Sequence, residues 1–130
     1  MDTHIFTGRW ITNRTFAAKQ PRNVFHRQLE PVSLPDGDRD CHILFRKKFT
    51  LPEKPEEAKI YITADDSYRL YINGTFAAEG PTASYPWVYG YNTVDITGFL
   101  HAGENTVAVH TLYYGLVNRV CVSADERQGL

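Results

Sequence analysis

The feature that most constrains the fold is a two-residue alternation of apolar and polar side chains, interrupted at short intervals by turn residues. Between residues 58 and 64 the run AKIYITA has alanine or isoleucine at every second position. After an Asp-Asp-Ser turn, Tyr68, Leu70 and Ile72 repeat the alternation. Successive side chains of a strand point to opposite faces, so this period predicts half-buried β-strands. Asn73-Gly74 then predicts a hairpin with a type I′ turn, which needs positive φ at both central residues.

Further segments rich in β-branched or aromatic residues extend this pattern to most of the chain. They are Cys41 to Thr50, Phe76 to Glu79, Val94 to Thr97, Thr106 to Leu112 and Val117 to Ser123. A single helical turn is expected at Gly98 to Leu100, with Thr97 as its N-cap. Because no amphipathic helix of three turns is present, the sequence predicts an all-β fold, an antiparallel β-sandwich of the jelly-roll type.

A chain of 130 residues suits one domain. We expect residues 1–40 to form an irregular N-terminal segment, here called the lead. It should pack on the sandwich through apolar anchors such as Trp10 and Ile11. We expect residues 41–130 to form the β-sandwich domain. After the last expected strand, Asp125 to Gly129 is turn-like and no further strand follows, so we expect the sandwich to be truncated at its C-terminal end.

Composition and charge argue against several classes of partner. The formal net charge is −1, with Lys and Arg spread along the chain, so neither a nucleic-acid-binding stripe nor a basic membrane face is expected. No apolar stretch approaches the roughly 18 residues of a membrane-spanning helix. The N-terminus lacks the apolar run of a signal peptide, so we expect a cytoplasmic protein. Cys41 and Cys121 fit reduced thiols there better than a disulfide.

The most unusual motif is an aromatic stripe at every second position between residues 85 and 91. It consists of Tyr85, Trp87, Tyr89 and Tyr91, and we expect Tyr113 and Tyr114 to be its neighbours. Flat aromatic faces stack on sugar rings, which would make the stripe a carbohydrate platform. The same rings also suit core or interdomain packing, which we favour because amphipathic rings are common at such boundaries. If another domain normally covered the stripe, its exposure would promote self-association.

Neither catalysis nor a metal site is expected from the residues themselves. Glycoside hydrolysis needs two carboxylates facing one cleft, whereas the acids here fall in turns, where hydrogen bonds to the local backbone explain them. The adjacent Asp65 and Asp66 would point to opposite sides of a strand. The five histidines lack zinc-ligand spacing. The loop Pro35 to Asp40 (PDGDRD) has three alternating carboxylates, which leaves calcium as an alternative to a solvated loop. No cofactor is expected.

The order of the motifs resembles one known family. Phe45 to Pro52 is followed by Tyr68 to Gly74, then by Gly80-Pro81, then by Val94 to Thr97, and finally by Gly103 to Asn105. This order is similar to that of the N-terminal β-sandwich domain of bacterial α-L-rhamnosidases, and more loosely to the galactose-binding-like jelly rolls of β-galactosidases and β-glucuronidases.

The resemblance implies a non-catalytic domain that braces a downstream catalytic (α/α)6 barrel and contacts rhamnose- or galactose-containing glycans at most in a supporting role. In that family the catalytic acids belong to the barrel, so no catalytic residue is carried over to this chain. Two alternatives stay open: a stand-alone carbohydrate-binding module, and the equivalent domain of a β-galactosidase-like enzyme.

Overall fold

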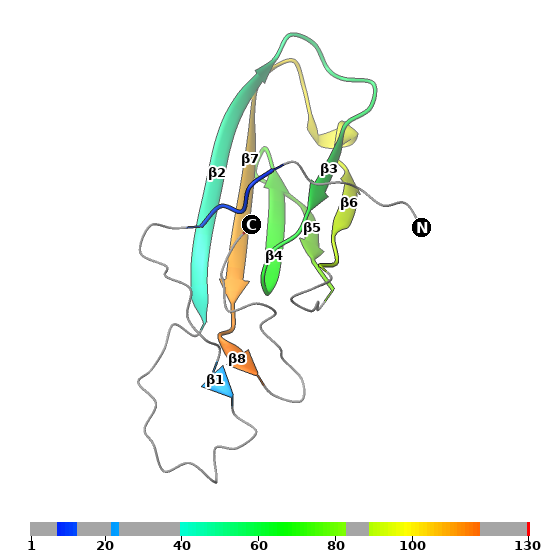
Figure 1. Cartoon of the computed structure of the whole chain (residues 1–130). Helices are drawn as coiled ribbons and strands as arrows, with labels where there is room; N and C mark the ends of the chain where they lie inside the picture. The colour runs from blue at the N-terminus through cyan, green and yellow to red at the C-terminus, as the bar shows by residue number, and fades with distance from the viewer. Residues whose placement is uncertain (1–7, 13–21, 24–39, 83–88, 118–129) are drawn as a thin grey trace.

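The computed structural model describes residues 8–12, 22–23, 40–82, 89–117 and 130 (Figure 1). Eight strands and one 3-10 turn make up its regular structure. They are β1 (Arg22–Asn23), β2 (Cys41–Leu51), β3 (Lys59–Ile62), β4 (Ser67–Ile72), β5 (Thr75–Gly80), β6 (Asn92–Asp95), η1 (Thr97–Phe99), β7 (Gly103–Tyr113) and β8 (Leu116–Val117). Every pairing is antiparallel except the short parallel pair of β1 with β8. The predicted all-β, antiparallel sandwich class is therefore confirmed.

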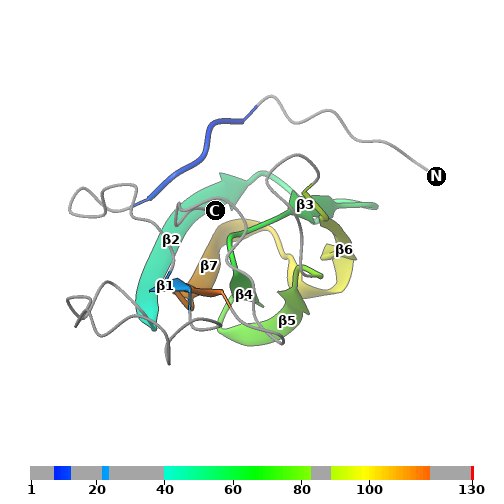
Figure 2. The same ribbon diagram turned by 60° about the horizontal axis from the view of Figure 1, so that its bottom comes forward.

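A four-stranded sheet with the order β2-β7-β4-β5 forms the larger wall. Its longest ladder joins β2 to β7 over their full lengths, from Cys41 opposite Tyr113 to Leu51 opposite Gly103. Strands β3 and β6 form a separate two-stranded sheet that continues the curve beyond β5, as Figure 2 shows. The two sheets together enclose the core from three sides.

Residues 8–12 cross the remaining side, between β2 and β3 (Figures 1 and 2). The backbone of Ile11 exchanges two hydrogen bonds of 3.0 Å with that of Leu130. Leu130 also packs against the core cluster. This part of the lead therefore lies against the sandwich, while the division of the chain into a lead and a sandwich domain stays a prediction.

The core follows from the predicted alternation. Side chains at every second position of β4 are buried, whereas Arg69 between them is exposed. The buried cluster is made of Ile62, Ala64, Tyr68, Leu70, Ile72, Ile96, Leu100 and Val109. In β3, Ile60 and Ile62 face inward and Lys59 and Tyr61 face outward, as predicted.

The Asn73-Gly74 turn has the backbone predicted for it, with φ of 51° at Asn73 and 82° at Gly74. The Asn73 side chain has a second role that the hairpin motif does not require. Its Nδ2 donates to the carbonyl of Phe99 (2.9 Å) and to Oδ1 of Asn105 (2.8 Å), while its Oδ1 accepts from the backbone N–H of Thr106 (2.7 Å). The hairpin is thereby tied to the segment that leads into β7.

Asn105 completes this network from the inside. Its side chain donates to the carbonyls of His101 (2.8 Å) and Gly103 (3.1 Å), and its Oδ1 also accepts from the N–H of His101 (3.2 Å). Asn105 is only 1% exposed. A buried amide is tolerated because both its donor and acceptor groups have partners. We call the paired side chains of Asn73 and Asn105 the asparagine lock.

The predicted cap of the helical turn is wrong. Thr97 lies inside η1, and the residue before the turn, Ile96, makes no side-chain cap. The hydroxyl of Thr97 instead accepts a hydrogen bond from the N–H of Ala58 (2.9 Å). Asp95 takes the capping role, because its Oδ1 accepts from the N–H of Thr97 (2.9 Å). The long-range bond to Ala58 outcompetes the local capping geometry.

Two other expectations differ in extent from the structure. Tyr89 and Tyr91 precede β6 and are not part of a strand. The expected strand at Val117 to Ser123 begins earlier, at Leu116, and residues 118–123 lie outside the described part. In that part of the chain, no helix is long and apolar enough to cross a membrane.

Candidate functional site

The aromatic stripe is divided between two separate ring contacts. Tyr85 and Trp87 lie outside the described residues. The ring of Tyr89 contacts Trp10 at a centroid distance of 5.0 Å, and the ring of Tyr91 contacts Tyr61 at 6.3 Å. Thr63 Oγ1 donates to the carbonyl of Gly90 (2.7 Å), which fixes the segment between the two rings against the end of β3.

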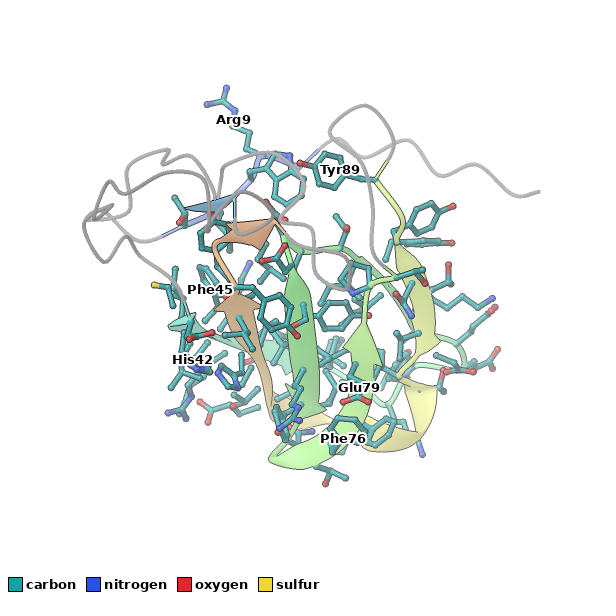
Figure 3. The ribbon with its side chains drawn as sticks, turned by 90° about the horizontal axis from the view of Figure 1, so that it is seen from below. Arg9, His42, Phe45, Phe76, Glu79 and Tyr89 are labelled. Atoms are coloured by element: carbon teal, nitrogen blue, oxygen red, sulfur yellow. The ribbon has the colours of Figure 1, made fainter. Side chains whose placement is uncertain are left out.

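We call Trp10, Tyr61, Tyr89 and Tyr91 the aromatic face. Trp10 is 49% exposed and Tyr61 is 41% exposed. Figure 3 shows Tyr89 on the opposite side of the molecule from Phe76 and Glu79, which belong to the four-stranded sheet. The rings of the two pairs are tilted by 59° and 53°. The two rings of each pair therefore do not form one flat surface, so a sugar would have to stack on a single ring.

Tyr113 does not belong to this face. It ends the inward-facing row of β7 and is only 1% exposed, because the alternation along that strand directs residues 105, 107, 109, 111 and 113 inward. Tyr114 is partly buried, and its N–H donates to Oδ2 of Asp66 (2.6 Å). Because Tyr113 is buried within this chain, it would not be exposed even if a neighbouring domain were absent. A binding role for the other stripe residues stays a prediction.

Sequence reasoning missed a second cluster, on the outer face of the four-stranded sheet. The register places His42 of β2 diagonally across from His110 of β7, and Arg69 of β4 opposite His110. His42 Nδ1 lies 2.7 Å from His110 Nε2, and the two rings stack at a centroid distance of 4.9 Å. Only strand register reveals this cluster, since His42 and His110 are far apart in sequence.

The two histidines border a shallow depression of about 440 Å³. Arg69 and Glu79, whose Nε and Oε2 lie 3.6 Å apart, line it with Leu112, Pro81 and Tyr114. Figure 3 shows His42 and Glu79 on this outer surface. Burial, followed by the positive charges of His42 and Arg69, lowers the pKa of His110. Burial and these neighbouring charges therefore disfavour the protonated form of His110.

Four of the described carboxylates, those of Asp95, Glu104, Glu57 and Glu79, have structural partners. Hydrogen bonds from Thr97 lower the pKa of Asp95, and the hydrogen bond and charge of Lys48 lower the pKa of Glu104. A general acid needs the opposite shift, a raised pKa. Glu57 and Glu79 pair with Lys59 and Arg69. These four carboxylates therefore form ion pairs and turn contacts.

No group of three or more His, Cys, Asp or Glu side chains among the described residues could hold a metal ion. The candidate calcium loop is described only at Asp40, which is exposed and has a φ of 52°. Cys121 also lies outside the described residues, so the redox state of the two cysteines stays a prediction.

Comparison with solved structures places the fold among rhamnosidases. The chain is 36% identical to a GH78 family rhamnosidase of Bacillus sp. GL1, with a TM-score of 0.64 over 70% of this chain and 10% of that enzyme. It is 29% identical to the α-L-rhamnosidase of Aspergillus terreus, with a TM-score of 0.54 over 62% of this chain and 10% of that enzyme. The chain thus spans about a tenth of the length of these enzymes.

An FMN-binding β-glucuronidase shares the fold at 15% identity, with a TM-score of 0.52 over 70% of this chain and 14% of that enzyme. No protein of curated function matches the sequence significantly. A family model described as the α-L-rhamnosidase N-terminal domain matches residues 53–125, from the loop after β2 to beyond β8. These residues include the asparagine lock and most of the core. The chain belongs to the family of α-L-rhamnosidase N-terminal domains.

Proposed function

We propose that the chain is a non-catalytic domain that braces the catalytic domain of an α-L-rhamnosidase-like glycoside hydrolase. The observation that carries this proposal is the use of the described carboxylates. Asp66, Asp95 and Glu104 accept hydrogen bonds from Tyr114, Thr97 and Lys48. Groups held this way stabilise the fold and are poorly suited to protonate a leaving group.

The aromatic face is the surface that we assign to the interdomain contact. Trp10 exposes a large ring beside the partly buried Tyr89, and Tyr61 exposes one beside the partly buried Tyr91. Amphipathic rings of this kind are enriched where protein surfaces meet. The tilt within each ring pair favours packing against an irregular protein surface over stacking on a flat sugar ring. By resemblance, the partner is the downstream catalytic barrel.

Two experiments test this proposal. The first measures hydrolysis of a nitrophenyl α-L-rhamnoside by the chain alone. We expect a rate equal to that of buffer, and turnover that survives repurification would overturn the non-catalytic assignment.

The second experiment places this chain in the rhamnosidase of Bacillus sp. GL1, in exchange for the equivalent segment. We expect the exchanged enzyme to have a higher thermal midpoint than the same enzyme with that segment deleted. Within the exchange, Tyr61→Ala should lower the midpoint, whereas Leu44→Ala on the outer face of the four-stranded sheet serves as the matched control. An exchanged enzyme no more stable than the deletion would refute bracing.

A further inference from the structure

The Asn73-Gly74 turn combines an accessible backbone with a restrained side chain. Gly74 is exposed, and a Cβ added to it would meet no atom within 4 Å. The neighbouring Asn73 amide is held in the asparagine lock by Thr106, Phe99 and Asn105. Asn-Gly is also the dipeptide in which the following backbone nitrogen has the least steric obstruction to attack on the asparagine side chain. The turn therefore places an accessible nucleophile, the backbone nitrogen of Gly74, beside the Asn73 side-chain amide, whose movement is restrained.

We propose that Asn73 is a self-modification site, at which deamidation is prevented while the asparagine lock is closed and proceeds when the hairpin opens. The backbone nitrogen of Gly74 loses its proton to solvent and attacks Cγ of Asn73. A C–N bond forms, the side-chain nitrogen takes up a proton and leaves as ammonia, and a succinimide results. Water then adds to either carbonyl and opens the ring, which gives aspartate or isoaspartate. No oxidant, reductant or cofactor is consumed.

The closed lock opposes this reaction at both ends of the amide. Cyclisation requires Cγ to move toward the Gly74 nitrogen, but Oδ1 of Asn73 is held 2.7 Å from the N–H of Thr106. Departure of ammonia requires the amide nitrogen to lose its planarity and take up a proton. Its two N–H groups, however, donate to Phe99 and Asn105 at 2.9 and 2.8 Å. Attack therefore needs these three bonds to break, which requires local opening of the hairpin.

The product cannot restore the lock. A carboxylate at position 73 has no N–H to donate, so its oxygens would face the Phe99 carbonyl and Oδ1 of Asn105, both of which are acceptors. Only the bond from Thr106 would survive. Isoaspartate also lengthens the backbone by one carbon within a two-residue turn. Each opening that ends in reaction therefore leaves a hairpin that closes less stably, and the modification accumulates in one direction.

The test follows deamidation of the whole chain in mildly alkaline buffer by peptide mapping, which detects the mass gain when an amide NH2 becomes OH. An isoaspartyl-specific methyltransferase identifies the product. We expect the folded chain to react at least about tenfold more slowly at Asn73 than the same chain in urea, because only the open fraction reacts. Equal rates in the folded and unfolded chain would overturn the proposal.

The matched variants separate the lock from general stability. Asn105→Ala removes one acceptor of the Asn73 amide, and Ile43→Ala shortens a buried side chain of β2 away from the hairpin. At denaturant concentrations that give both variants the same folded fraction, we expect Asn105→Ala to deamidate severalfold faster at Asn73. Equal rates in the two variants would refute a specific role for the lock. Should Asn105→Ala not fold, the ratio of rates in the folded and unfolded unaltered chain decides.

Discussion

Asn73 and Asn105 are joined by a hydrogen bond of 2.8 Å between their side-chain amides, although Asn73 lies in the β4–β5 turn and Asn105 in β7. Asn73 ends the β4 side of the hairpin, and Asn105 lies buried near the start of β7. The bond couples the Asn73-Gly74 turn to the His101–Gly103 turn, because Asn105 also donates hydrogen bonds to the carbonyls of His101 and Gly103. Most of the amide groups in both side chains are satisfied within the protein.

Replacement of Asn105 by alanine should therefore lower the free energy of unfolding by about 2–4 kcal/mol, since it leaves several backbone carbonyls and the Asn73 amide without partners. Urea denaturation measures this loss. In a double-mutant cycle, Asn73→Ala and Asn105→Ala should show a coupling of roughly 1 kcal/mol or more. Strictly additive losses would mean that the two side chains act independently.

Substitution at Gly74 tests the backbone of the turn. Gly74→Ala should cost about 1 kcal/mol, because the φ of 82° is unfavourable for any residue with a Cβ. Gly98→Ala is the matched control, because a Cβ there also meets no atom within 4 Å but the backbone lacks a positive φ. We expect this control to be neutral or stabilising in thermal denaturation. Equal costs at both positions would exclude backbone strain as the cause.

Gly80 is required for a different reason, the close approach of β6. A Cβ at this position would lie 2.7 Å from Oδ1 of Asn92, the first residue of β6. Gly80→Ala should therefore destabilise the fold by about 1 kcal/mol, the low end of overpacking costs, because the clashing atoms belong to a side chain that can turn away. Asn92→Ala should recover part of that loss when combined with it. If the double variant is no more stable than the sum of the single losses predicts, the clash is not the cause.

The histidine pair predicts a stability that depends on pH. Burial and the neighbouring charges of His42 and Arg69 lower the pKa of His110 in the folded state, so the unfolded chain binds the proton more readily. Above both pKa values the histidine is neutral in both states, and its titration costs no stability. As the pH falls below about 6.5, protonation favours the unfolded chain and the free energy of unfolding decreases. Thermal midpoints across this range should decrease less steeply in His110→Gln.

His101→Gln provides the control for that measurement. His101 is exposed, and its ring contacts the carbonyl of the adjacent Ala102 rather than another histidine. This variant removes one histidine and leaves the His42–His110 pair in place. A slope that His101→Gln flattens as much as His110→Gln does would assign the effect to histidine content in general.

Binding of free sugar by the aromatic face is the remaining prediction. Titration with L-rhamnose at millimolar concentration, followed by heteronuclear NMR, should leave the resonances of Tyr61, Tyr89 and Tyr91 unchanged if these rings serve interdomain packing, the role that we propose for them. D-Glucose is the control for nonspecific effects. Shifts confined to these residues and specific for rhamnose would instead support a carbohydrate-binding module.

The sequence was most informative where structure depends on neighbouring residues. Alternation predicted β3 and β4 with their correct faces, and Asn73-Gly74 predicted the turn with positive φ at both residues. Both signals are local, because strand pleating and turn geometry involve only a few adjacent residues.

Contacts that depend on strand register could not be predicted in this way. The His42–His110 pair needs the alignment of β2 with β7, and the burial of Tyr113 depends on the face that β7 turns inward. The cap at Thr97 failed for a similar reason, since a distant backbone group, Ala58, binds its hydroxyl. From sequence alone, an aromatic stripe is equally consistent with exposed and with buried rings. The structure decides between them by showing the contact partners, here Trp10 for Tyr89 and Tyr61 for Tyr91.

The full-length pairing of β2 with β7 has a kinetic consequence. Strands β3 to β6 all lie between β2 and β7 in sequence. The β2–β7 ladder therefore forms either after the intervening strands have folded or at the entropic cost of closing a long loop. The hairpin of β4 and β5 needs no such search. We expect a high contact order to make folding slow, with the hairpin established early and the edge strand β2 added late. Until β2 docks, the unpaired backbone N–H and C=O groups along the edge of β7 are open to misassociation.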